Sequence, residues 1–470
     1  MLQTLKNAWR TKEIKSKILF TLFILLLYRI GTVVPVPFVD ANNFAGQFQG
    51  TILDYMNILS GGSLGTATLF ALGVTPYINA SIIIQLLSVV FPKLGELAKT
   101  DKKKMNFITR IVTVALALVT AIGYYFLLSN SNMLTNAAIK GESSAYWFYA
   151  IVIVACYCAG ASLVMWLAER VNEHGIGNGI SIILFANIIS SLPSMLYQLF
   201  NLCYATFSYE DPFWYAFVSI LFAVVFLALT VASVVFVIWV TGSERRIPIQ
   251  YAKRAVGRKM YGGQSSKLPI KLNMTGVMPV IFASSIVSLL PTILALCGVS
   301  GEGDGFWNWC ARFFGSDGFV YPIMLLVLII AFAYFYTQIT FDPIEVANNL
   351  KKQGGAINGI RQGRPTSDYI RKILNKITLA GALFLSIIAV VPVVVGPHVV
   401  QHILEWIRSG WYSADQISSN WTAIESYAKS LSGVFTFGGT SLIIVVGVVL
   451  ETFRELEAQL TMRNYKGFLD

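Results

Sequence analysis

The sequence predicts an all-α membrane protein with ten transmembrane helices in two inverted five-helix halves. Of its 470 residues, 55% are apolar and only 13% are charged, and the mean hydropathy is +0.64. The apolar residues come in repeated blocks of about 20, the length that crosses the hydrocarbon core of a bilayer as a helix. The blocks predict spans at about 18–38, 74–92, 108–128, 146–168, 180–200, 213–240, 276–297, 320–340, 377–397 and 434–453.

The basic residues predict the orientation of these spans. The chain starts with a basic region and an apolar core, but no small-residue cleavage site follows Leu27, so we expect an uncleaved first span. Of the 35 Lys and Arg residues, 30 fall in the tails and loops on the side of the termini. Only 4 fall in the alternate loops, and Arg29 lies in the first span. The positive-inside rule therefore predicts cytoplasmic N and C termini, and the net charge of +11 needs no nucleic-acid partner.

The arrangement of the spans predicts an internal symmetry. Five spans precede the acidic external link around Glu210 and Asp211, and five follow it. Because five is odd, the second half (201–470) must cross the membrane in the opposite sense to the first half (1–200), as in an inverted repeat. Ionisable residues avoid the middles of the spans, whereas ion-coupled carriers keep such a residue as their coupling site. This pattern argues against a coupled transporter.

One apolar stretch, residues 57–91, is broken in a way that a plain spanning helix is not. Glycines at 61, 62 and 65 loosen its first third, and Gly73 with Pro76 interrupts it before the uniform run from Ile78 to Val90. The pattern predicts a half-inserted segment followed by a true span. Irregular backbone at membrane depth survives only where it is buried in protein or lines an aqueous cavity. We therefore expect a cavity at this place.

Two aliphatic pairs follow breaks in the chain. Val74 and Ile78 flank the proline, and Ile180 and Leu184 follow the Gly-rich turn within ERVNEHGIGNGISIILF (169–185). Residues four apart share a helix face, so both pairs could point into one central space. On the pattern alone, ordinary core packing is the simpler explanation. The turn lacks the G-x-G-x-x-G spacing of a nucleotide-binding loop.

The sequence offers no catalytic or metal centre, and we expect no enzyme activity, no cofactor and no metal. It has no Walker A motif and no Ser/His/Asp or Cys/His constellation, and its five cysteines lack zinc spacing. His398, His402 and Glu405 share a helix face at a spacing that a metal could use, but no further ligand accompanies them. With two tryptophans nearby, an amphipathic helix at the outer interface explains this stretch better.

Several long motifs resemble the SecY family, the channel subunits of the bacterial protein-translocation complex. They are SGGSLGTATLFALGVTPYINASIIIQLL (60–87), NEHGIGNGISIILFA (172–186), MPVIFASS (278–285), NNLKKQGG with NGIRQG (348–363) and FGGTSLIIVV (437–446). The resemblance covers nearly the whole chain. The external segments 298–319 and 398–433 are its least typical parts.

The resemblance implies a clamshell of two five-helix halves around an hourglass pore. By motif, the aliphatic ring at its waist comprises Val74, Ile78, Ile180, Leu184, Ile281 and Ile444. The Gly-rich segment from about 57 to 69 matches the plug of the outer funnel, with Asn57, Ser60, Gly61, Gly62 and Gly65 as plug residues. An aliphatic ring repels small ions by dewetting. It can also seal around any polypeptide, because it makes no directional bonds.

The resemblance also implies a lateral gate toward lipid, between the second and third spans on one side and the seventh and eighth on the other. The gate residues would be Asn79, Gln85, Ser284 and Ser285.

The cytoplasmic loops 241–275 and 341–377 carry 8 and 7 basic residues. A solvated basic loop that obeys the orientation rule explains part of this charge. The loops also suit the docking of a large anionic or acidic partner. In the family these loops bind the ribosome or the SecA motor ATPase, and the candidate docking residues here are Arg245, Arg246, Lys253, Arg254 and Arg361.

Two classes of function remain open. The first is a protein-conducting channel in the bacterial plasma membrane, which passes unfolded secretory chains and releases apolar segments into lipid. The alternative is an inverted-repeat small-solute secondary transporter, which should place polar ligands at half-helix ends near the midplane. This chain has Val74, Ile78 and Ile180 there, which favours the channel. The resemblance further implies SecE and SecG as partner subunits, with signal peptides, nascent chains and membrane lipids as contacts.

Overall fold

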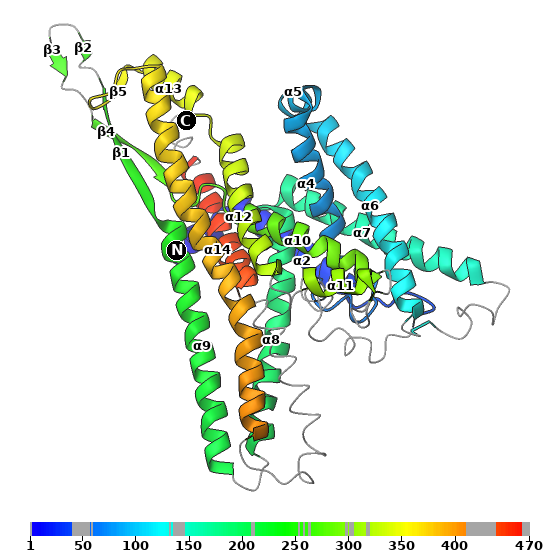
Figure 1. Cartoon of the computed structure of the whole chain (residues 1–470). Helices are drawn as coiled ribbons and strands as arrows, with labels where there is room; N and C mark the ends of the chain where they lie inside the picture. Colours follow the sequence, from blue (N-terminus) through cyan, green and yellow to red (C-terminus); the bar gives the residue numbers. More distant parts are fainter. Residues whose placement is uncertain are drawn as a thin grey trace.

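The computed structural model is a bundle of long helices that carries a small β-structure at one end (Figure 1). It describes residues 2–39, 57, 60–130, 133–134, 146–207, 212–251, 254–256, 259–261, 265–296, 299, 305–315, 320–409 and 439–462.

The helices of the first half follow one another closely in the chain. They are α1 (Leu2–Arg10), α2 (Lys12–Gly31), α4 (Thr75–Val90), α5 (Pro92–Thr100), α6 (Lys102–Asn130), α7 (Tyr146–His174) and α8 (Gly179–Phe207). The second half contributes α9 (Pro212–Gly242), α10 (Met278–Leu296), α11 (Phe306–Phe314), α12 (Val320–Thr340), α13 (Pro343–Lys352), α14 (Arg364–Ser409) and a last helix at 439–462.

A helix overlaps each of the ten segments that the sequence predicts to span a membrane. By length and composition, 5 of the described helices could cross a bilayer, or 6 if α4 and α5 form one bent span. The axes of α4 and α5 differ by 117°. The number of ten spans therefore stays a prediction, while the mostly helical, multi-pass character is confirmed.

The break inside residues 57–91 is present in the structure. Residues 60–74 follow a series of turns, and α4 then begins at Thr75 with Pro76 in its first turn. Proline fits there because the first residues of a helix have no intrahelical acceptor for their backbone N–H groups. The irregular segment is buried against α6 and α7: Tyr124 Oη donates to Leu64 O, and Tyr157 Oη donates to Ala67 O at 3.3 Å.

Two glycines let this irregular segment approach the helices closely. A Cβ atom at Gly160 of α7 would lie 1.9 Å from the carbonyl oxygen of Leu69, and one at Gly31 of α2 would lie 2.0 Å from the ring of Phe70. Any larger residue at either position would push the segment away. The helices of the first half thus form a fitted seat for residues 60–73, so buried protein surrounds its irregular backbone, as membrane depth requires.

The two basic loops fold together, which the sequence reasoning did not predict. Strand β1 (Glu244–Tyr251) pairs antiparallel with β4 (Ser265–Lys271) and with β5 (Gly355–Ile357) from the other loop, in the order β4-β1-β5. Strands β2 (Arg254–Val256) and β3 (Lys259–Tyr261) form a second, two-stranded hairpin. A separate apolar core joins this sheet to α13 and α14, and comprises Ile247, Ile249, Ile270, Leu350, Ile357, Ile370, Ile373 and Leu374.

The alternation in β1 explains why this sheet forms. Ile247 and Ile249 are buried, whereas their neighbours along the strand face solvent. This period of two is typical of a strand with one covered face. Gly355 and the buried Ile357 bring the second loop onto the edge of β1, opposite Tyr251 and Ile249.

Candidate functional site

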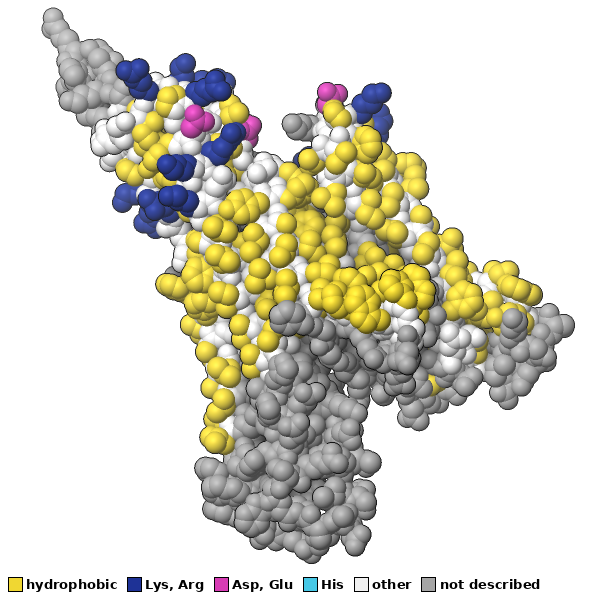
Figure 2. Space-filling view, in the orientation of Figure 1, with side chains coloured by type: hydrophobic (Ala, Val, Ile, Leu, Met, Phe, Trp, Pro, Cys, Tyr) yellow, Lys and Arg dark blue, Asp and Glu magenta, His cyan; other side chains and the backbone are white. Residues whose placement is uncertain are grey.

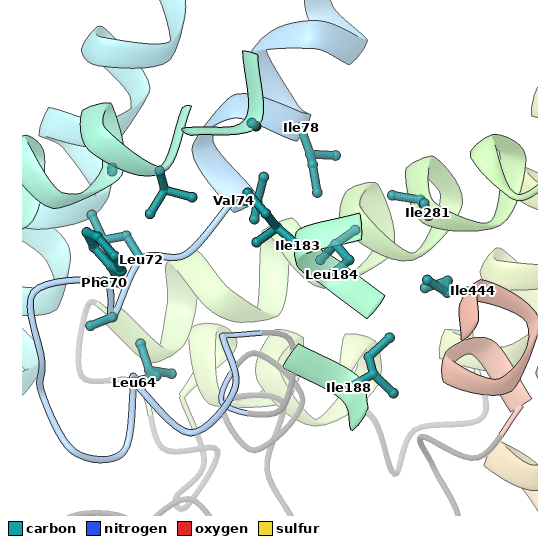
Figure 3. Close-up of a cluster of buried hydrophobic side chains, with 14 of the residues drawn as sticks. Leu64, Phe70, Leu72, Val74, Ile78, Ile183, Leu184, Ile188, Ile281 and Ile444 are labelled. Carbon is teal, nitrogen blue, oxygen red and sulfur yellow. The ribbon is translucent and has the colours of Figure 1, made fainter. Parts of the chain in front are cut away.

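Four helical segments bring the predicted ring residues into one apolar cluster (Figure 3). Val74, Ile78, Leu184, Ile281 and Ile444 are each at most 4% exposed, and the half-buried Ile180 packs against the same cluster. Val74 and Ile78 come from the start of α4, Ile180 and Leu184 from the start of α8, and Ile281 from the start of α10. Ile444 comes from the helix at 439–462. Helix beginnings therefore meet at this place.

Close packing of glycines fixes the positions of these helix starts. A Cβ at Gly179, the first residue of α8, would lie 2.0 Å from the Ala168 carbonyl oxygen of α7. A Cβ at Gly447 would lie 1.9 Å from Cγ1 of Val277, the residue before α10. Because neither position tolerates a side chain, α8 and the last helix approach their neighbours far enough to deliver their aliphatic residues to the cluster.

The cluster is closely packed, and five of the six predicted ring residues are buried in it. Its side chains fill the space between the helices, as their low exposure requires, and none of the six carries a charge or a hydrogen-bonding group. A small ion placed among them would lose hydration without a replacement ligand. The arrangement can exclude water and ions, and it has no group that could bind a polar solute in a fixed orientation.

The five predicted plug residues lie in one hydrogen-bonded turn. Asn57 O accepts from Gly62 N at 2.7 Å, and Asn57 Oδ1 accepts from Gly65 N at 2.7 Å. Ser60 Oγ accepts from Leu64 N at 3.1 Å. Gly61 and Gly62 both have positive φ values (70° and 87°), a conformation that residues with a Cβ atom adopt only with strain.

A buried polar contact beside this turn was missed by the sequence reasoning. Asn187 of α8 and Tyr28 of α2 are both 0% exposed, and Asn187 Nδ2 donates to Tyr28 Oη at 2.9 Å. A Cβ at Gly61 would lie 2.8 Å from Asn187 Oδ1, so the turn packs directly on this pair. The signal was present, because an asparagine within a predicted span is costly unless it has a partner or a role.

Of the predicted gate residues, Gln85 lies where the two halves meet. Tyr336 of α12 donates a short hydrogen bond to Gln85 Oε1 of α4, and this bond connects the second half to the first. Ser284 and Ser285 are buried on α10, with Ser284 Oγ donating to Ile281 O at 2.9 Å.

The aromatic residues around this contact were not predicted as part of the gate. The ring of Phe282 on α10 packs against Tyr336, with 5.2 Å between the ring centroids. Asn79 Oδ1 of α4 is buried, and it has no hydrogen-bond partner among the described residues. Among the described residues, the bond between Gln85 and Tyr336 joins α4 to α12 across this seam.

The basic residues gather at the ends of the molecule that carry the sheet with α13 and, separately, α5 (Figure 2). Arg245, Arg246 and Arg361 are all exposed, and Arg246 Nε donates to Glu244 Oε1 at 2.6 Å. Arg361 lies in the turn between β5 and α14. Arg254 lies in β2, and Lys253 lies outside the described residues.

The surroundings shift the pKa values of two charged groups outside the predicted spans. Burial lowers the pKa of the Lys271 ammonium at the end of β4, and nearby Arg454 adds to this shift while Glu244 opposes it. At the start of α6, the backbone N–H of Lys104 donates to the Asp101 carboxylate and holds its pKa below the ordinary value.

The part of the chain that the structure describes contains no group of three or more His, Cys, Asp or Glu residues placed to hold a metal. His398, His402 and Glu405 belong to the C-terminal part of α14, which is one continuous helix and not a separate short one.

Fold and site together define a class: a multi-pass helical membrane protein with a cluster of buried aliphatic residues at helix beginnings, beside an irregular, buried segment. The SecY family model matches residues 68–453, and the chain belongs to the SecY family. It is 38% identical to the protein translocase subunit SecY of Streptomyces galbus over 481 residues, and 39% identical to that of Mycobacterium tuberculosis (strain H37Rv) over 491 residues. Each alignment covers 100% of both chains.

Solved structures share the fold at low sequence identity. One, described as the structure of a protein conducting channel, matches with a TM-score of 0.60 and 17% identity, covering 94% of this chain and 92% of that chain. Sec61 in the canine ribosome–channel complex matches with a TM-score of 0.57 and 16% identity, over the same shares. These findings confirm the predicted SecY-like fold and favour the channel over a small-solute secondary transporter.

The contact between Gln85 and Tyr336 generates a prediction about the seam. Tyr336→Phe removes the hydroxyl that joins α4 to α12, and one such interhelical bond in a membrane is worth about 0.6 kcal/mol on average. We expect a roughly threefold shift toward separated halves. Spin labels at Ile83 and Ile339, in a chain without native cysteines, would show a longer or broader distance distribution by pulsed EPR.

The matched control for this measurement is Tyr334→Phe. Tyr334 Oη donates to Asn375 O within the second half, so its loss should leave the distance between the labels unchanged. Equal distributions for both variants would mean that the tyrosine on α12 does not hold the seam.

Proposed function

We propose that this protein is the protein-conducting channel of a bacterial translocase, which passes unfolded secretory polypeptides across the plasma membrane and releases apolar segments sideways into lipid. The observation that carries the proposal is the closed constriction made of six aliphatic residues at helix beginnings, in a chain of the SecY family. A channel needs a seal that opens for a chain of any sequence. Aliphatic side chains supply it, because they can move apart and repack without breaking directional bonds.

Passage of a polypeptide requires two changes in this chain. The ring residues must separate, and the plug turn around Asn57 and Gly61 must leave its seat on α2, α6, α7 and α8. The described hydrogen bonds that hold this segment include those from Tyr124 to Leu64 and from Tyr157 to Ala67. Since each such bond is worth about 1 kcal/mol net, an entering chain can displace the plug.

Sideways release would use the seam between α4 with α6 and α10 with α12. Asn79, Gln85, Ser284 and Ser285 lie along this seam, and an apolar segment that replaces their contacts meets lipid on the outside. The seam opens when the two halves, 1–200 and 201–470, move apart as units on either side of the ring.

The exposed basic sheet suits the docking of partners on the cytoplasmic side. The excess of Lys and Arg on that side predicts that both termini also lie there. We propose the SecA motor ATPase and the ribosome as alternative partners there, and SecE and SecG as the small subunits that complete the channel. The chain acts without enzyme activity or a cofactor of its own. A partner or the membrane potential therefore drives transport.

The ring makes a testable prediction. Ile180→Ser and Ile281→Ser, combined in one chain, place two hydroxyls in the constriction and lower the cost of hydrating it, by about 1–3 kcal/mol for each polar group. Liposomes that contain this variant should lose ions at least about tenfold faster than liposomes with the unchanged protein. A dye-based ion flux assay measures the rate.

The control pair for the flux assay is Leu118→Ser with Ile151→Ser, two lipid-exposed residues of α6 and α7. This pair carries the same chemical change and should leave the liposomes tight. If the ring variant is also tight, the six residues do not form the barrier. Saturable uptake of a small solute by the unchanged protein would favour the transporter instead.

Docking at the basic sheet generates a second prediction. Arg361 is exposed and its side chain supports no described packing contact, so Arg361→Glu should leave membrane insertion and stability intact. Motor-driven export of a secretory protein into inverted vesicles should fall by roughly tenfold, as for loss of an arginine at the centre of an interface.

Lys103→Glu reverses a charge of the same sign at an exposed position near the start of α6 and serves as the control. Export should be close to normal with this variant. Equal losses for both variants would indicate a general electrostatic effect, and normal export with Arg361→Glu would remove this residue from the docking surface.

A further inference from the structure

A shallow groove of about 620 Å³ lies at the end of α2 that is remote from its basic start. We name it the Arg29 groove, and its lining residues are Leu26, Arg29, Ile30, Val33, Val34 and Pro35. The sequence reasoning noticed Arg29 as the exception among the spans, and the function proposed above gives this arginine no role. Five of the six lining residues are apolar, so the groove combines one permanent cation with an apolar wall.

The apolar wall of the groove is exposed on the surface of the chain. Leu26, Ile30 and Val33 are each more than half exposed, and Leu22 continues the same exposed stripe along α2 toward its basic start. In a multi-pass membrane protein such a stripe contacts acyl chains. The groove is therefore the place where the lipid-facing side of α2 reaches the head-group region.

The guanidinium of Arg29 lacks a strong partner. Nη1 donates to Gly61 O at 3.5 Å, the long limit for a hydrogen bond, and none of the ion pairs among the described residues includes Arg29. A guanidinium offers five N–H donors, and it binds phosphate oxygens in pairs. An anion with phosphate geometry would satisfy these donors better than one distant carbonyl does.

We propose that the Arg29 groove binds one anionic phospholipid, with the phosphate on the Arg29 guanidinium and an acyl chain along Leu26, Ile30 and Val33. Charge complementarity and the exposed apolar wall together favour a lipid, because a free phosphate would make no use of the wall. Under the orientation proposed above, the lipid belongs to the outer leaflet. The binding itself does not depend on the transport function.

The bound lipid would contact the plug region through the protein. Leu69 N donates to Val34 O at 2.9 Å, and Pro35 forms an isolated bridge with Thr68, so the wall of the groove is bonded to the end of the irregular segment. The same guanidinium also reaches the carbonyl of Gly61 at the beginning of that segment. A phosphate on Arg29 competes with this carbonyl, and the lipid thereby acts on the plug turn.

The test uses the full-length chain in vesicles that contain a trace of phosphatidylglycerol with a photoreactive acyl chain. Irradiation followed by peptide mass spectrometry reports adducts within residues 26–35. We expect about tenfold more adduct with this probe than with a matched phosphatidylcholine probe, since both lipids offer a phosphate to Arg29 but the choline adds a positive charge that the guanidinium repels. Arg29→Gln should remove this preference, and Arg29→Lys should retain most of it.

Lys104→Gln, a change at an exposed lysine near the start of α6, is the control and should leave the adducts at 26–35 unchanged. Equal labelling by the two probes, or unchanged labelling in Arg29→Gln, would overturn the proposal. Loss of the adducts when the small partner subunits are present would show that a protein covers this face, and would overturn it too. If Arg29→Gln does not fold, the comparison of the two probes on the unchanged chain still decides.

Discussion

Close packing of aliphatic side chains where three helices begin is the constraint on which the rest of the structure depends. Val74, Leu184 and Ile281 come from three helices that all begin at this point, and their close contact holds only because each helix starts there. Because each helix has to start at this point, the chain has a turn before α4, a glycine at the start of α8 and a short loop before α10. A longer α4 would cross the centre and occupy the space that the ring now closes.

Because α4 begins only at the aliphatic cluster, the chain before it is irregular. Its backbone cannot bond to lipid, so the first half surrounds it with tyrosine hydroxyls and with glycines that allow close approach. Tyr124, Tyr157 and Gly160 hold it in place. The segment therefore fills the bundle beside the aliphatic cluster.

Much of this architecture could be predicted from the sequence, since hydropathy, glycine and proline mark the spans and their breaks. The family motifs supplied Ile281 and Ile444, which no local pattern distinguishes from ordinary core residues. The β1, β4 and β5 sheet was missed because it joins two loops: β5 has only 3 residues and lies about a hundred residues after β1 in the chain. The pair of Asn187 and Tyr28 was missed because the asparagine within a span indicates only that a partner is needed, and nothing in either segment alone shows that the partner is Tyr28. Side-chain partners across helices, such as Gln85 with Tyr336, follow from packing and not from periodicity.

The central claim is that the aliphatic ring surrounds a passing polypeptide. A photoreactive amino acid at Ile78 or Ile281, with a secretory chain stalled during export, tests it most directly. The account predicts adducts from both positions to the stalled chain, and none from lipid-facing Leu118 of α6. Adducts from neither ring position, while the chain is demonstrably stalled in the channel, would contradict the claim.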